Sequence, residues 1–243
     1  MVRTFVVRGL LLGLLAGLVA GGFAFAFGEP QVDAAIALEE AADGHSHSHG
    51  SEAEVSRPVQ KAGLFLATGL YGLAVGGIFA LAFAGLRGRV GPRSDGLLAL
   101  AAAGTAFVAV ILVPFLKYPA NPPAVGDPET IDSRTFLYVV MILVGLAAAA
   151  IAVATSRRVH AGPWPRWIAA AVAFFVPVVA SWMLLPTVDE VPDGFPATLL
   201  WEFRLASIGT QLVFWAAFGA LFGWACDRAA QRGAAPVGAA APG

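Results

Sequence analysis

The stretch TFLYVVMILVGLAAAAIAVAT, residues 135–155, contains no Asp, Glu, Lys, Arg or His. A helix rises ~1.5 Å per residue and the hydrocarbon core of a bilayer is ~30 Å thick, so about 20 apolar residues can cross it. Arg134 directly precedes the stretch, and Arg157 and Arg158 follow it closely. This pattern of an uncharged stretch between charges predicts a transmembrane helix.

Five further apolar stretches of similar length occur along the 243 residues, of which 58% are hydrophobic and 13% charged. Soluble domains carry roughly 25% charged residues, and a soluble fold of this size could not bury so much apolar surface. We therefore predict an all-α, polytopic transmembrane helix bundle of about six spans in a lipid bilayer, with five spans as the alternative. The predicted spans are Gly9–Phe27, Ala62–Leu86, Gly96–Leu116, Thr135–Thr155, Trp167–Leu185 and Leu205–Ala225.

These spans divide the chain into four parts. We expect a first transmembrane helix in residues 1–27, an extracytoplasmic segment rich in His and acidic residues in 28–61, a five-helix membrane bundle in 62–228, and a disordered cytoplasmic tail in 229–243.

The first apolar stretch has two interpretations. Arg3 and Arg8 before it, and the small residues of AFA at 24–26, are also typical of a cleaved signal peptide. We favour a retained helix because the apolar stretch is longer than a signal-peptide core. In addition, its glycines recur every four residues and form a smooth face on which another helix can pack closely. These glycines are Gly9, Gly13, Gly17 and Gly21.

The distribution of charge predicts the orientation. With six spans, one side holds ten of the fifteen Lys and Arg residues, and this side is expected to be cytoplasmic, together with both termini. The other side holds fourteen of the sixteen carboxylates. Such an acidic face attracts cations, although outer loops without the basic residues retained inside would look the same. The expected location is the plasma membrane, and no basic excess indicates a nucleic-acid partner.

A histidine run lies in the predicted outer segment. His45, His47 and His49 alternate with serines between Gly44 and Gly50. Imidazole binds divalent first-row metals, and alternate residues of an extended chain project to the same side, so two or three rings can meet one ion. The chain's single cysteine, Cys226, excludes an internal disulfide and is expected to be a buried packing residue. We predict metal capture by the histidines, with a polar linker as the alternative.

Carboxylates precede the histidine run on a predicted short helix that begins near Pro30. Glu29, Asp33 and Glu40 share one face of this helix and are secondary candidates for metal ligands. A solvated helical face explains them equally well.

The spans contain no Asp, Glu, Lys, Arg or His at depth, so a charged relay is not expected there. Phosphate-loop, HExxH and GxSxG motifs are also absent from the sequence, which argues against an enzyme. Arg134 and Arg204 each begin a span on the outer side, and we expect both to pair with loop carboxylates.

Four stretches together resemble the CbtA family of cobalt transporter subunits. They are GLLAGLVAGGFAFAFGEPQVDAAIALEE (13–40), HSHSH (45–49), LKYPANPPAVGDPETIDSRTFLYVVM (116–141) and GFPATLLWEFRLASIGTQ (194–211). The resemblance implies about five spans, a histidine-bearing segment after the first, and a link to cobalamin. It also implies a small single-span, histidine-bearing partner, CbtB.

Two functions follow from these observations. The first is a membrane subunit for uptake of cobalt or a similar divalent ion, without a tightly bound cofactor, in which the histidine segment captures Co²⁺ as cargo. The alternative is a metal-binding or scaffold membrane protein that does not conduct ions.

Overall fold

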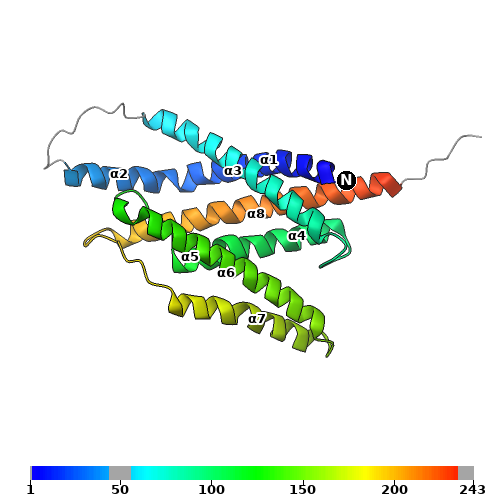
Figure 1. The fold of residues 1–243 in the computed structure, drawn as a ribbon. Helices are drawn as coiled ribbons and strands as arrows, with labels where there is room; N and C mark the ends of the chain where they lie inside the picture. The colour runs from blue at the N-terminus through cyan, green and yellow to red at the C-terminus, as the bar shows by residue number, and fades with distance from the viewer. Residues whose placement is uncertain (1, 44–55, 235–243) are drawn as a thin grey trace, which may run out of the picture. The chain divides into compact units, whose positions relative to one another are not determined.

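The computed structural model describes residues 2–43 and 56–234, and these form helices joined by turns, with no strand among them (Figure 1). Six helical segments are long and apolar enough to cross a membrane. They are α1 (Val2–Phe27), α3 (Arg57–Leu86), the continuous segment α4 (Asp95–Ala106), η1 (Phe107–Leu112) and α5 (Val113–Lys117), then α6 (Ile131–Arg158), α7 (Pro163–Leu184) and α8 (Ala197–Ala234).

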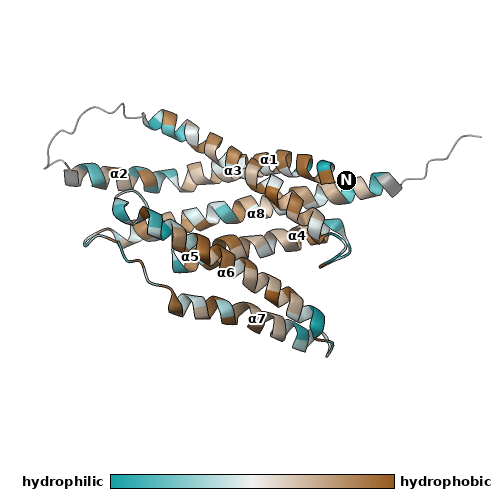
Figure 2. Cartoon of the chain, viewed as in Figure 1, coloured by the Kyte–Doolittle hydropathy of each residue, from teal (hydrophilic) through white to brown (hydrophobic). Residues whose placement is uncertain are grey.

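The six predicted spans are confirmed as helices, although most begin or end outside the predicted limits. Hydrophilic residues gather at the helix ends and hydrophobic residues cover the middle portions (Figure 2). The fifth predicted span forms α7, which begins with Pro163 in the first turn and continues through Pro177. Residues 229–234, which we expected in a disordered tail, continue α8 because the alanines, glutamine and arginine there favour helix.

The predicted short helix after the first span is also present, as α2 (Glu29–Asp43). Gly28 separates it from α1: the Gly28 N–H donates to the Ala24 carbonyl at 2.7 Å, and the Gly28 carbonyl accepts from Gln31 and Val32. Consequently α2 begins with its own first turn directly after the end of the span.

The third span contains a π-helical turn, η1. The Val113 N–H donates to the Val108 carbonyl, five residues back. Pro114 has no N–H, so the next bond of this pattern, to the Ala109 carbonyl, cannot form. Gly145 of α6 lies directly against that carbonyl, because a Cβ added at Gly145 would overlap it. Because Gly145 has no side chain, α6 can pack directly against the backbone of the π-helical turn.

The chain divides into two compact units. The first contains the chain up to Ala20, Phe65–Gly104, and the part from Val213 onward. Within it, Gly9 and Gly13 of α1 pack against the carbonyls of Gly76 and Gly72 of α3.

A third glycine, Gly17, packs in the same way on the carbonyl of Thr68. The predicted close packing of the glycine face is thus confirmed at three positions. Beside this contact, α3 and α8 share an aromatic core in which the Phe79 and Phe218 rings meet edge to face with centroids 5.0 Å apart.

The second unit contains Gly21–Leu64 and Thr105–Leu212. In it α6 packs along α7 and against η1 and α5. Met141 and Ala148 of α6 are fully buried there, together with Val178, the one buried residue of α7. Apart from Val178, the side chains of α7 are therefore exposed or half-buried.

Candidate functional site

The functional candidates lie at the helix ends joined by residues 28–56, 118–130 and 185–196, which we call the acidic end. The histidines of the prediction, His45, His47 and His49, lie outside the described residues. The segment that carries them connects α2 to α3. The structure describes the contacts between α2 and α3, the two helices that flank this segment.

Two of the predicted carboxylates are engaged by cations at the start of α3. Arg57 donates from Nη2 to Glu29 Oε2 at 2.7 Å and from Nε to Asp33 Oδ1 at 3.0 Å. Lys61 Nζ pairs with Asp33 Oδ2 at 2.8 Å. These bonds tether α2 to α3, since they join side chains from both helices.

Lys61 and Arg57 also favour the ionised form of Asp33. Hydrogen bonds from Lys61 and then Arg57 hold the pKa of the Asp33 carboxyl below its ordinary value. Asp33 is therefore ionised at neutral pH, but a metal ion would have to displace a cation to bind it. Glu40 is exposed near the end of α2 and is not brought into this cluster.

No three His, Cys, Asp or Glu side chains meet in a metal-binding group within residues 2–43 and 56–234. The described part of α2 thus supplies carboxylates near the histidine segment, but not a complete ligand set.

A second cluster joins the other two connections of the acidic end. Glu190 accepts from the Thr130 hydroxyl at 2.6 Å and from the Asp127 N–H at 3.1 Å, and it pairs with Arg134 at 3.1 Å. The Thr130 hydrogen bond contributes most to a lowered pKa of Glu190, with the Asp127 N–H and the Arg134 charge adding to it. The predicted pairing of Arg134 with a loop carboxylate is confirmed.

A glycine and two side-chain hydrogen bonds shape the connection at 118–130, which holds this cluster. Gly126 has φ 123°, and a Cβ there would lie 2.6 Å from Arg134 Nη1. The loop is also fixed to the end of α7: Tyr118 donates from its hydroxyl to the Pro186 carbonyl at 2.8 Å, and Lys117 Nζ donates to the Trp182 carbonyl at 3.0 Å. Lys117 and Tyr118 therefore fix the connection at 118–130 to the end of α7.

A cavity of about 760 Å³ lies beside this cluster and is lined by Tyr118, Asn121, Arg134, Tyr138, Glu190 and Arg204, among others. The prediction that Arg204 pairs with a loop carboxylate was wrong. Arg204 donates to the Ala120 carbonyl at 3.3 Å and to Asn121 Oδ1 at 3.0 Å. Arg204 lies seven residues inside α8, and the connection at 118–130 supplies it with neutral oxygens.

Hydroxyl groups within the spans bond to their own helices. Ser207 donates to the Phe203 carbonyl at 2.9 Å and Thr210 to the Ala206 carbonyl at 2.8 Å. Their donor hydrogens are thus used, while the oxygens keep lone pairs that can accept or coordinate. The spans offer neutral oxygen atoms rather than charges.

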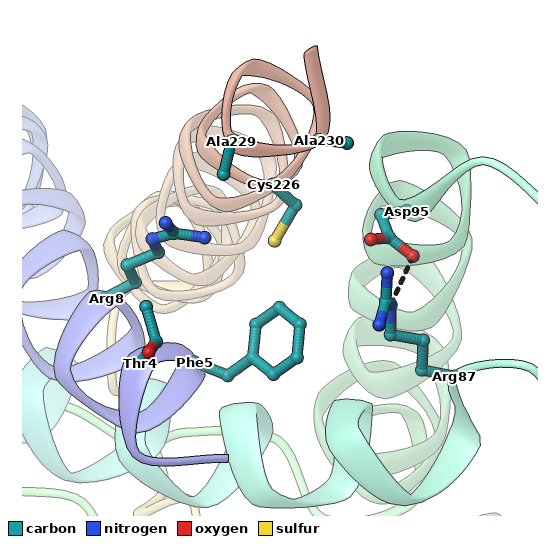
Figure 3. Close-up of a pocket in the computed structure, with 8 residues that line it drawn as sticks. All are labelled: Thr4, Phe5, Arg8, Arg87, Asp95, Cys226, Ala229 and Ala230. Carbon is teal, nitrogen blue, oxygen red and sulfur yellow. Dashed lines mark hydrogen bonds and ion pairs between the residues drawn. The ribbon is translucent and has the colours of Figure 1, made fainter. Parts of the chain in front are cut away.

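The first unit holds a smaller cavity of about 260 Å³, between the start of α1 and the end of α8 (Figure 3). Arg87 lies over the Phe5 ring and pairs with Asp95 at 2.7 Å. Cys226 faces the same space and is buried, as predicted for a packing residue. A single thiol beside a carboxylate that is already paired is not a metal site.

Comparison with known proteins gives one finding. The family model described as "Probable cobalt transporter subunit (CbtA)" matches residues 2–227. No curated protein and no solved structure matches the chain.

Proposed function

We propose that this chain, which belongs to the CbtA family of probable cobalt transporter subunits, captures Co²⁺ at its histidine segment and passes it to the spans for uptake. The observation that carries the proposal is the match over residues 2–227 of a multi-pass membrane chain that contains His45, His47 and His49. Co²⁺ is the cargo in this proposal, not a resident cofactor.

The geometry of α2 supports capture at this place. Arg57 and Lys61 tether α2 to α3, so the histidine segment begins and ends on helices that are held together. Glu40, exposed on the last turns of α2, is positioned in sequence to assist the histidines, whereas Glu29 and Asp33 serve the tether first. Imidazole rings would make the first contacts with the ion, since neutral imidazole is a good ligand for Co²⁺.

The remaining features of the proposal concern orientation and partners. The acidic end faces outward and both termini are cytoplasmic, because ten of the fifteen Lys and Arg residues lie on the other side. Because none of the sequence motifs of ATP hydrolysis is present, a partner, the membrane potential or an ion gradient supplies the energy. A small single-span, histidine-bearing protein of the CbtB type is the expected partner.

The decisive experiment measures radioactive Co²⁺ uptake by cells over a concentration series at pH 7.5 and 5.5. The triple variant H45A/H47A/H49A should lose uptake mainly at low Co²⁺, because a collecting site raises the local ion concentration and its loss can be offset by adding ion. The lower pH should mimic the variant, since protonated imidazoles, with a pKa near ~6.5, cannot coordinate.

His160 provides the matched control. It is the fourth histidine of the chain and is exposed in the connection between α6 and α7, at the other helix ends. His160→Ala should leave the uptake curve unchanged. Equal uptake by the triple variant and the wild type at every concentration and both pH values would refute the capture role.

The scaffold alternative predicts a different result. Deletion of the chain would then alter the assembly of another membrane complex without changing cellular cobalt under limitation. A side-by-side comparison of cobalt, nickel and zinc in the same deletion strain separates the two functions and identifies the metal.

A further inference from the structure

A second hollow of the first unit lies between the start of α1 and the end of α8. It has a volume of about 370 Å³ and is lined by Arg8 from α1 and by Trp224, Arg228 and Arg232 from α8. The α8 residues recur every four positions and therefore share one helix face. Ala225 and Ala229, whose side chains are small, complete the lining. Figure 3 shows Arg8 extending from α1 toward the part of α8 that carries Ala229.

The lining of the hollow is positively charged. Its three charged residues are all arginines. Of the nearby carboxylates, Asp95 pairs with Arg87, and Asp227 contacts the start of α4, where it accepts from the Gly96 N–H at 2.9 Å. Within the described residues, the ion pairs of the chain do not include Arg8, Arg228 or Arg232.

Three guanidinium groups around one hollow favour an anion, since they repel one another and each offers several N–H donors in a planar fork suited to phosphate. Trp224 indicates where the rest of the ligand lies. Its side chain is 64% exposed, one turn closer to the apolar middle of α8 than Arg228. Exposed indole rings at this depth are typical of the membrane interface.

We propose that this hollow binds the phosphodiester headgroup of an anionic phospholipid, with the acyl chains running beside Trp224. A lipid fits better than a free phosphate because the hollow is on a helix that the bilayer surrounds, and because its exposed apolar edge continues toward the span. Basic pockets between transmembrane helices bind anionic headgroups in this way.

The end of α6 provides a matched control. Arg157 and Arg158 are exposed in its last turn, and they do not line the hollow. R157Q/R158Q and R228Q/R232Q therefore remove the same charge from helix ends of the same kind. The first pair of substitutions leaves the hollow unchanged, so it should not affect a lipid that is held there.

The test is native mass spectrometry of the full chain released from mixed micelles, with phosphatidylglycerol or phosphatidylcholine as the probe. Each arginine in contact with the headgroup should change affinity about fivefold, so R228Q/R232Q should weaken phosphatidylglycerol binding about 25-fold. R157Q/R158Q should bind as the wild type does. Equal binding by the two double variants would overturn the proposal.

The wild-type chain gives a second measurement that does not depend on the folding of a variant. It should retain phosphatidylglycerol about tenfold more tightly than phosphatidylcholine, with the difference shrinking as salt screens the charges. Equal retention of both lipids would overturn the proposal. Displacement of phosphatidylglycerol by millimolar inorganic phosphate would assign the hollow to free phosphate and would also overturn it.

Discussion

Replacing Gly13 with alanine tests the close contact of α1 and α3 most directly. A Cβ at position 13 would lie 3.0 Å from the Gly76 Cα and still closer to the Gly72 carbonyl oxygen. Carbon atoms pack best at about 3.5–4.0 Å, so the helices would have to separate by roughly 0.5–1 Å. Backbone atoms on both sides leave no flexible side chain that could move instead.

The size of the effect follows from that separation. A gap of ~0.5–1 Å loses about a quarter to a half of the dispersion energy of each contact. Overpacking of this kind typically costs about 1–3 kcal/mol. In a chain of this length, a loss of that size lowers the midpoint of thermal unfolding by about 2–12 °C.

Two glycines on the same helices provide controls. Gly22 of α1 and Gly85 of α3 have no neighbouring atom within 4 Å of an added Cβ. Alanine at either position should leave stability unchanged or raise it slightly, because alanine favours helix by up to ~1 kcal/mol over glycine. Thermal unfolding of Gly13→Ala, Gly22→Ala and Gly85→Ala in one detergent measures the difference. If the first variant is as stable as the other two, the close approach of α1 and α3 is not part of the folded protein.

Three other perturbations follow from the acidic end and the π turn. Glu190→Gln should lower the free energy of unfolding, and a double-mutant cycle with Arg134→Gln should show coupling between the two side chains; additive effects would argue against the ion pair. The lowered pKa of Asp33 means that its stabilising effect is complete above its unfolded pKa of ~3.9 and is lost only as pH falls below this. Spin labels on α2 and α3 should therefore keep their distance from pH 7 to 5 and separate below about pH 4, and separation at pH 6 would contradict the tether. Gly145→Ala should destabilise by about 1–3 kcal/mol because it meets the Ala109 carbonyl, while Gly104→Ala, which has open space, should not; equal denaturation midpoints would exclude that contact.

The sequence predicts the spans well because a bilayer imposes one length and one polarity on every crossing helix. It also predicts the contact of Gly9, Gly13 and Gly17, since glycines at four-residue spacing have few other uses on an apolar helix. The partner helix was not predictable, because Gly72 and Gly76 lie among several small residues of α3.

The details of the candidate site were less accessible to sequence. Charge alone suggested that Arg134 and Arg204 would behave alike, but only Arg134 reaches a carboxylate. Arg204 bonds to Ala120 and Asn121 because of the path of the second loop, which depends on Gly126 and its positive φ. The role of Arg57 and Lys61 as partners of α2 was also missed, although opposite charges at the two ends of one connection were a usable indication.

If the histidine segment captures Co²⁺ as proposed, the tether between α2 and α3 limits how far the bound ion can travel. The connection from Asp43 to Arg57 spans about 14 peptide units of at most ~3.6 Å each, so its middle reaches no more than about 25 Å from its anchors. Ligands confined to such a radius act at an effective concentration on the order of millimolar. Histidines that bind cobalt weakly in dilute solution would still present it repeatedly to the same few helix ends. A shorter or longer connection between Asp43 and Arg57 would therefore change how efficiently the ion reaches the spans, with every ligand unchanged.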